Sequence, residues 1–366
     1  MIDDRPPSLD FEKSLRGQRV FVTGHTGFTG GWLTSWLKLL GCDVAGLALA
    51  PVTEPNLFVA AQIADGMVSS LGDIRDLDVV RGAIDRHRPA VIFHLAAQPL
   101  VSRSFVDPVE TFSTNAIGTA NALEAARLSP SVKAVVCITT DKVYRDQDWS
   151  WGYREIDPLG GKDPYSASKA CAELIADSYR ATLAARGNGV LIANARGGNI
   201  IGGGDWSADR IVPDFVRAIT SKEPIVLRNP EAVRPWQHVM ALAHGYLVLA
   251  ARLLAGDASA ADNWNFGPAN DDAKPVRALV EGLSAAWHRP EIVYAKGGFP
   301  ETRYLKLDST KARTLLRWSP PLAFAQTVQL TAEWYRSFSA QPAHAKQLTM
   351  QQIDRYRESI VANAHA

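Results

Sequence analysis

The stretch Arg19-Val20-Phe21-Val22-Thr23-Gly24-His25-Thr26-Gly27-Phe28-Thr29-Gly30-Gly31-Trp32-Leu33 decides the fold. An apolar run passes directly into a turn whose glycines, Gly24, Gly27 and Gly30, are spaced GxxGxxG. Between a strand and a helix, such glycines permit a positive φ, let a phosphate reach backbone N–H groups, and let the helix pack closely on the strand. Plain strand-to-helix turns also contain glycine, so the triplet indicates dinucleotide binding only together with the strands that follow.

Short apolar runs alternate with longer amphipathic ones along the first half of the chain. This alternation predicts a doubly wound α/β fold, a parallel Rossmann sheet with helices on both faces. The predicted strands cover residues 19–23, 43–49, 67–70, 90–96, 134–140 and 190–196, and the predicted helices cover 29–40, 77–88, 108–128 and 165–186.

Beyond residue 196 the chain changes to loops that contain glycine and tryptophan. Helices are predicted at 211–220 and 239–254, a strand at 264–266, and further elements at 275–288, 304–307, 309–316 and 324–337. We expect a dinucleotide-binding domain over 17–196, to which 237–267 returns. A smaller mixed α/β substrate lobe is expected over 197–236 and 268–345, with tails at 1–16 and 346–366.

The composition excludes several classes of protein. With 39 Lys+Arg, 38 Asp+Glu and 46% hydrophobic residues among 366, the chain is globular, and its net charge of +1 argues against a nucleic acid or other polyanion as partner. No apolar run serves as a signal peptide or spans a membrane. Three cysteines without metal-like spacing favour the cytoplasm, and the eight histidines form no HxxH or HExxH cluster, so no metal is expected.

Five polar residues form a candidate catalytic set. Tyr165 and Lys169 are four residues apart on one predicted helix, so the ammonium is expected to lower the pKa of the tyrosine toward that of a general base. Thr140, Asp141 and Lys142 follow the fifth predicted strand, at the edge where such sheets bind ligands. The plain alternatives are a solvated helix face for Tyr165 and Lys169 and a surface turn for Asp141 and Lys142. The convergence of these polar residues on one edge of the sheet favours a catalytic site.

The acidic residue that usually binds the adenosine ribose, about 20 residues after the glycine turn, is missing. Leu47-Ala48-Leu49-Ala50 stands at the end of the second strand, and Lys38 is the only cation between Gly31 and Gly72. Because no group there is suited to a 2′-phosphate, NAD is expected rather than NADP.

The chain resembles the extended short-chain dehydrogenase/reductase family over about residues 17 to 340. The resemblance rests on the glycine turn, the strand end His94-Leu95-Ala96-Ala97-Gln98, Thr140, and the pair Tyr165 and Lys169. The segments 149–155, 159–161, 196–206 and 234–239 resemble the nucleotide-sugar dehydratases of that family. Dehydratases of dTDP-sugars carry Asp-Glu after the catalytic threonine, whereas this chain has Asp141-Lys142. The resemblance therefore implies CDP-glucose as the substrate, and it leaves open which group takes the proton from carbon 5.

The resemblance also implies roles for individual residues. Tyr165 would take the proton of the hexose 4-hydroxyl, Asp141 would protonate the departing 6-hydroxyl, and Lys142 is the candidate base at carbon 5. The implied catalytic residues are Thr140, Asp141, Lys142, Tyr165 and Lys169. The implied NAD-binding residues are Gly24, Gly27, Phe28, Thr29, Gly30, Asp73, Ile74, Leu95, Ala96, Ala97, Asn115, Thr140, Tyr165 and Lys169. The implied substrate-binding residues are Gln98, Asn199, Trp206, Arg210, Arg228 and Arg234.

Several of these residues have plain structural alternatives. Asp73 could cap the following helix, Asn115 could bond to backbone, and the tryptophans Trp206 and Trp236 could pack in the core rather than stack on the substrate. His94, in an apolar strand, is expected to be a hydrogen-bonded core histidine. The family commonly forms dimers or larger assemblies, so a homodimer or homotetramer is implied.

Two other functions share parts of the same pattern. An epimerase, or a different sugar dehydratase, would keep the glycine turn, Tyr165 and Lys169, but an epimerase has no need for the acid at Asp141. A protein that only senses NAD would not require the intact catalytic set.

Overall fold

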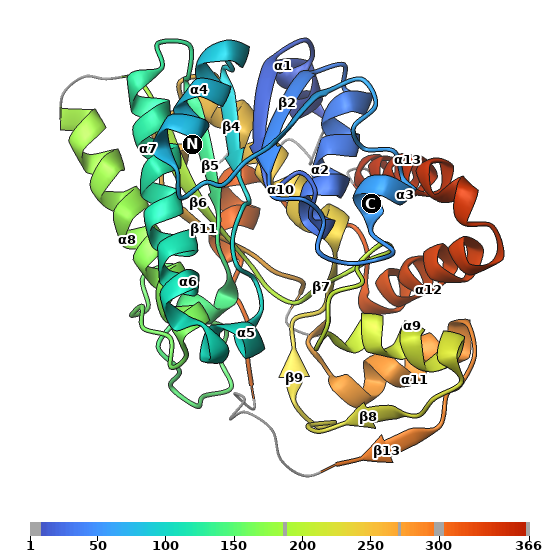
Figure 1. The fold of residues 1–366 in the computed structure, drawn as a ribbon. Coiled ribbons are helices and arrows are strands. Elements are labelled where there is room, and N and C mark those ends of the chain that lie inside the picture. The colour runs from blue at the N-terminus through green and yellow to red at the C-terminus, as the bar shows by residue number, and fades with distance from the viewer. Residues whose placement is uncertain (1–8, 186–188, 270–271, 296–303, 364–366) are drawn as a thin grey trace.

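The computed structural model describes residues 9–185, 189–269, 272–295 and 304–363. Its centre is a seven-stranded parallel sheet in the order β11-β6-β5-β4-β1-β2-β3 (Figure 1). The strands are β1 (Arg19–Thr23), β2 (Asp43–Ala48), β3 (Val68–Leu71), β4 (Val91–His94), β5 (Ala134–Ile138), β6 (Leu191–Gly197) and β11 (Asn263–Phe266). Each lies within two residues of its predicted bounds, so the doubly wound fold is confirmed.

The sheet grows in opposite directions from its middle. The strands β1 to β3 extend it one way and β4 to β6 the other, so β1 and β4 are neighbours, with Thr23 opposite His94. Ligands of such sheets bind where the order reverses, at the carboxyl ends of the strands. The residues that follow β1, β4 and β5 therefore share the edge that is suited to a ligand.

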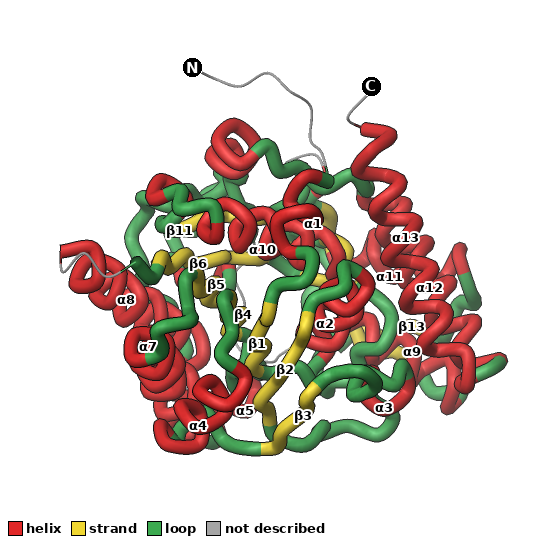
Figure 2. Tube along the Cα trace, turned by 90° about the horizontal axis from the view of Figure 1, so that it is seen from above, coloured by secondary structure: helices red, strands yellow, loops and turns green. Residues whose placement is uncertain are grey.

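Helices cover both faces of this sheet (Figure 2). The helices α4, α7 and α8 pack side by side on one face, while α10 packs with α2 and α1 on the other. The bounds of these helices, and of others in the chain, are α1 (Asp10–Leu15), α2 (Phe28–Leu39), α3 (Leu57–Ala60), α4 (Leu77–His87), α5 (Val101–Val106), α6 (Pro108–Phe112), α7 (Gly118–Leu128), α8 (Pro164–Ala185), α10 (Val239–Leu254), α12 (Phe324–Ala340) and α13 (Ala345–Asn363). Short turns of helix are η1 (Ser113–Ile117), η2 (Asp141–Val143), η3 (Ala258–Ala260), η5 (Ala312–Leu316) and η6 (Pro342–His344).

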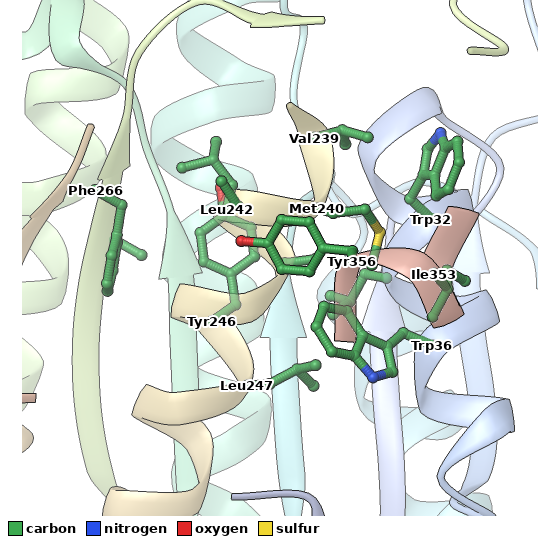
Figure 3. Packing of buried hydrophobic residues seen from close by; sticks show 14 of the residues in the cluster. Trp32, Trp36, Val239, Met240, Leu242, Tyr246, Leu247, Phe266, Ile353 and Tyr356 are labelled. Carbon is green, nitrogen blue, oxygen red and sulfur yellow. The ribbon is translucent and has the colours of Figure 1, made fainter. Parts of the chain in front are cut away.

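The core beneath α10 explains why that helix is apolar on nearly all sides. Tyr246 of α10 is fully buried, and Figure 3 shows it among side chains from α2, α10 and α13, including Trp36 and Tyr356. A helix that is hydrophobic all round is stable only when it is buried, and here α2 and the sheet enclose it. No helix among the described residues is long and apolar enough to cross a membrane.

Both segments expected to be tails contain packed helices. The helix α1 buries Phe11 and Leu15 against α10, and α13 buries Ile353 and Tyr356 against α12 and α2. Their apolar residues are spaced so that each helix has one buried side, a pattern that is typical of a packed helix rather than a tail.

A smaller group of elements lies beside the sheet, at the lower right of Figure 1. Its helices are α9 (Ile211–Ser221) and α11 (Val276–Ala286). Its strands pair in twos: β7 (Ile200–Ile201) with β10 (Gln237–His238), β9 (Val233–Arg234) with β12 (Lys274–Pro275), and β8 (Ile225–Leu227) with β13 (Ile292–Tyr294). The division into two domains remains a prediction.

Candidate active site

The glycine turn meets each steric requirement that its sequence predicts. Gly24 has φ +78°, and a Cβ there would lie 2.8 Å from the backbone nitrogen of Ala96. A Cβ at Gly30 would lie 2.1 Å from the carbonyl oxygen of Gly24, so only glycine lets α2 pack this closely on the turn. Gly27 is the N-cap of α2, with no side-chain cap, and the next residues, Phe28 and Thr29, are half-buried.

The loop after β4 is held to the glycine turn by one hydroxyl. The Oγ1 of Thr23 accepts hydrogen bonds of 3.1 Å from the N–H groups of Leu95 and Ala96. The same oxygen lies 2.9 Å from Nδ1 of His94, whose Nε2 bonds to Thr119. Burial, assisted by the charge of Lys169, lowers the pKa of His94 to about 3. His94 is therefore the neutral core histidine that was expected, and its ring holds the Thr23 hydroxyl to which Leu95 and Ala96 are bonded.

Asn115 joins this loop to helix α8. Its Oδ1 accepts from the backbone N–H of Gln98 at 2.8 Å, and its Nδ2 donates to the Gln98 carbonyl and to Oγ of Ser168 at 2.8 Å. Asn115 lies in η1, a π-helical turn that interrupts the single helix predicted over 108–128. The side-chain amide of Gln98 bonds to Leu100 of the same loop and to Thr111 of α6, so its predicted contact with substrate has no support from this geometry.

Asp141 is a buried carboxyl group with an unused oxygen. It is 2% exposed, its Oδ1 accepts from the Thr140 hydroxyl at 3.1 Å, and its Oδ2 has no hydrogen-bond partner. Burial raises its pKa to about 6, although the charges of Lys142 and Arg234 act in the opposite direction. A carboxyl group in this state can deliver a proton near neutral pH, as a general acid must.

Tyr165 lies beside Thr140 and Asp141, but its ionisation differs from the sequence-based expectation. Burial raises the pKa of Tyr165 to about 12, and a side-chain hydrogen bond with Thr140 and the charge of Arg210 oppose this rise. Lys169 donates instead to the carbonyl oxygen of Ile138 at 3.0 Å, and burial lowers its own pKa to about 8. The expected lowering of the tyrosine pKa by Lys169 is therefore wrong for the chain alone, because the lysine is itself buried and turned to backbone.

The structure brings two of the three predicted arginines to this set. Arg210 acts by its charge on Tyr165 and pairs with Asp205 at 3.0 Å, and the buried Arg234 acts on Asp141. Arg228 is exposed after β8, and its charge acts on Asp214. Asn199 is half-buried, and its carbonyl oxygen accepts from the N–H of Gln237.

The two tryptophans favour the packing alternative. Trp206 lies against the rings of Trp334, Tyr335 and Phe338 at 5.1 to 5.9 Å. Trp236 is 4% exposed and donates from Nε1 to the Lys274 carbonyl oxygen. Stacking of Trp206 on the substrate stays a prediction.

The helix-cap alternative for Asp73 is wrong. The N-cap of α4 is Asp76, which accepts from the N–H groups of Asp78 and Val79. Asp73 instead holds Arg75 by hydrogen bonds of 2.6 to 2.9 Å, which lower the pKa of its carboxyl group. The neighbouring Ile74 is buried, so its predicted cofactor contact would have to use its backbone.

A buried ion pair that was not predicted from the sequence lies behind the catalytic set. Glu173 and Arg196 are 0% and 1% exposed, and their closest atoms are 2.5 Å apart. The only signal in the sequence is that Glu173 follows Lys169 by four residues on the same predicted helix, and that Arg196 ends a predicted strand. No cluster of three metal-binding side chains occurs in the described part of the chain.

Comparisons with known proteins agree with this geometry. The model of the NAD dependent epimerase/dehydratase family matches residues 20–267. The CDP-glucose 4,6-dehydratase of Salmonella typhimurium is 44% identical over 329 residues, covering 88% of this chain and 92% of that protein.

Two solved structures share the fold. The UDP-glucose 4-epimerase of Thermus thermophilus, in complex with NAD, superposes with a TM-score of 0.76 at 25% identity, covering 87% of this chain and 99% of that one. The dTDP-glucose 4,6-dehydratase of Bacillus anthracis, also with NAD, gives a TM-score of 0.75 at 24% identity, covering 88% and 98%.

Proposed function

The chain belongs to the NAD dependent epimerase/dehydratase family, and from this premise we propose that it is a CDP-glucose 4,6-dehydratase. It would convert CDP-D-glucose to CDP-4-keto-6-deoxy-D-glucose, a step of deoxysugar biosynthesis, and is a hydro-lyase. The observation that carries the proposal is the buried Asp141, whose Oδ2 has no partner and which lies beside Tyr165. Elimination of water needs an acid next to the base, whereas epimerisation does not.

The residues of the glycine turn fit a dinucleotide. Within 4 Å, a Cβ at Gly27 would meet only the Gly24 carbonyl oxygen, at 3.4 Å, and α2 begins there without a side-chain cap. A pyrophosphate is stabilised at such a helix start by free N–H groups and the helix dipole. NAD bound at this turn would supply the hydride-transfer chemistry, from carbon 4 of the hexose and back to carbon 6.

Oxidation at carbon 4 depends on Tyr165 as the base for the 4-hydroxyl proton. Thr140 supports this role, because its hydrogen bond with the tyrosine opposes the rise in the tyrosine pKa. Arg210 favours the phenolate by its charge. The resulting 4-keto group makes the proton at carbon 5 acidic, which prepares the substrate for loss of water.

Dehydration depends on Asp141 and Lys142. Protonated Asp141 gives its proton to the departing 6-hydroxyl, so the leaving group is water rather than hydroxide. Lys142 is half-buried, and its charge acts on Asp141. We propose that Lys142 takes the carbon 5 proton, for which it has to be in its neutral amine form. We also propose that Arg210 and Arg234 bind the diphosphate, for which guanidinium groups are suited.

A panel of nucleotide sugars tests the function. CDP-, dTDP-, UDP- and GDP-glucose are incubated with the protein, and the products are identified by mass spectrometry and NMR. We expect a 4-keto-6-deoxyhexose only from CDP-glucose. A product that differs only in its configuration at carbon 4 would instead indicate an epimerase, and turnover of dTDP-glucose alone would refute the assignment to CDP-glucose.

NAD is expected to bind at least about tenfold more tightly than NADP. A 2′-phosphate at the end of β2 would lose its hydration next to exposed Leu49, without a cation as partner. Arg75, after β3, is already held by Asp73. Dissociation constants from calorimetry check this preference, and equal or tighter binding of NADP would contradict it.

We also propose that the chain forms a homodimer or homotetramer through α5, α6 and η1. These elements expose an apolar strip, Phe105, Val106, Val109, Phe112 and Ile117, next to α8. Exposed apolar strips of this kind mark interfaces. A monomer mass by light scattering at micromolar concentration would contradict the assembly.

The three cysteines Cys42, Cys137 and Cys171 form no disulfide. We propose that the protein works in a reducing compartment, the cytoplasm. Localisation of a tagged full-length protein in its host would test this.

A further inference from the structure

A fully buried ion pair lies directly behind the catalytic set. Arg196, near the end of β6, donates from Nε to both carboxylate oxygens of Glu173, at 3.0 and 2.9 Å, and from Nη2 to Oε2 at 2.5 Å. Both side chains are closed off from solvent. The pair therefore interacts with the protein alone, and its contacts show what it can influence.

One arm of the pair reaches the end of β5 and helix α8. Oε1 of Glu173 accepts a hydrogen bond of 2.6 Å from the hydroxyl of Thr139, the residue before catalytic Thr140. Glu173 also lies one helical turn after Lys169 on α8. The carboxylate is thus linked to both segments that provide the residues for oxidation at carbon 4.

The other arm reaches the segment that follows Lys142. Nη1 of Arg196 donates to the hydroxyl of Tyr144 at 2.7 Å and to the Glu155 carbonyl oxygen at 3.2 Å, and the guanidinium lies 4.8 Å from the centre of the Tyr144 ring. The same hydroxyl donates to Asn265 of β11 at 2.7 Å. Tyr144 in turn stacks on Tyr153 at 4.9 Å.

Stability gives little reason for such a pair. Removing two charges from water costs several kcal/mol per ion, and exchange of a buried pair for neutral groups of similar size is often neutral or stabilising. Loss of one partner, in contrast, is strongly destabilising, because it leaves an unpaired buried charge. The position of this pair is better explained by the chain segments that it holds in place relative to each other.

We propose that the Glu173–Arg196 pair is a positioning element that couples the two half-reactions, since it joins the Thr139–Thr140 end and α8 to the Tyr144 segment that follows Asp141 and Lys142. It holds the tyrosine and lysine for oxidation and the acid and base for dehydration in one geometry. This inference rests on the proposed function, because it assumes that both half-reactions take place at this site.

The pair also affects the charge of Lys169. The titratable groups that act on or respond to this lysine are His94 of β4, Cys137 of β5 and Glu173 of its own helix. Burial lowers the pKa of Lys169, and Glu173 is one of the groups that oppose this lowering. Without the carboxylate, the lysine should lose its proton at a lower pH.

The test is the double variant Glu173→Gln/Arg196→Met, which removes both charges and keeps an acceptor for Thr139. The matched control is Glu12→Gln/Arg357→Met, which removes an ion pair of 2.7 Å that joins α1 to α13. In the Glu173→Gln/Arg196→Met protein, called the Glu173 variant below, we expect kcat with CDP-glucose to fall about 100-fold while KM changes by about twofold or less. The basic limb of its pH profile should move to lower pH. In a larger fraction of reaction cycles, the variant should release CDP-4-keto-glucose that has not lost water, and the hydride from carbon 4 would then remain on the reduced cofactor.

Hydrogen exchange of residues 139–155 provides a readout that needs no substrate. We expect faster exchange there in the Glu173 variant than in the wild type or the control, with both variants folded by circular dichroism. If wild-type protein turns over no nucleotide sugar but exchange still increases, the proposed function fails while the positioning role is supported. Unchanged kcat, product ratio and exchange in the Glu173 variant would overturn the inference.

Discussion

Asp141→Asn is expected to slow the dehydration of CDP-glucose about 10²- to 10⁴-fold while NAD binding stays as in the wild type. The amide keeps the shape of the carboxyl group but has no proton to give, so the 6-hydroxyl would have to leave as hydroxide. Oxidation at carbon 4 does not use this group. The variant should therefore accumulate reduced cofactor, visible as absorbance at the nicotinamide band in a single turnover.

The same substitution should make the protein more stable at neutral pH. Because the pKa of Asp141 is raised to about 6 in the folded chain, the folded state holds this proton more tightly than the unfolded state does. Its contribution to the free energy of unfolding is thus fully present at low pH and is lost as the pH rises from about 4 to about 6, by up to about 3 kcal/mol. Denaturant melts of both proteins at several pH values should show this loss in the wild type only.

Asp148→Asn is the matched control for both effects, since Asp148 is an exposed carboxylate in the same segment. It should change neither the dehydration rate nor the pH dependence of stability. Turnover of the Asp141 variant at the wild-type rate would remove Asp141 from the mechanism.

Gly30→Ala is expected to destabilise the fold by about 3 kcal/mol or more, and cofactor binding should be lost with it. The added methyl group would lie 2.1 Å from the carbonyl oxygen of Gly24. Neither atom can rotate away, because the oxygen belongs to the backbone and the position of a Cβ is fixed by the backbone that carries it. Helix α2 would have to move from the turn, which also displaces Trp32 and Trp36 in the core. Denaturant unfolding and calorimetric titration with NAD measure the two effects.

Gly27→Ala separates the packing of the turn from its binding function. Its Cβ would make an ordinary contact of 3.4 Å, so stability should change by less than about 1 kcal/mol. The methyl group would, however, stand where the pyrophosphate approaches the N-cap of α2, so NAD affinity should fall. Wild-type stability in Gly30→Ala, or wild-type NAD affinity in Gly27→Ala, would contradict this view of the turn.

The large sheet and the glycine turn could be predicted from sequence because both depend on local patterns. Alternating apolar runs determined the strands to within two residues. The spacing of Gly24, Gly27 and Gly30 determined the turn, in which Gly24 and Gly30 leave no room for a Cβ. The motifs around Thr140 and Tyr165 were likewise readable, since each lies within a few residues of chain.

Ionisation and pairing could not be read in the same way, because they depend on atoms that come together from distant segments. The i and i+4 spacing of Tyr165 and Lys169 suggested a lowered tyrosine pKa, but burial by the surrounding helices and strands raises it. Asp141 could be recognised in the sequence as a possible acid, but only its burial in the folded chain raises its pKa to a value suited to proton donation. Sequence by itself thus determined where the strands, the turn and the reactive groups are, while the tertiary structure decided their proton affinities and joined Glu173 to Arg196, because desolvation and contact are properties of the folded chain alone.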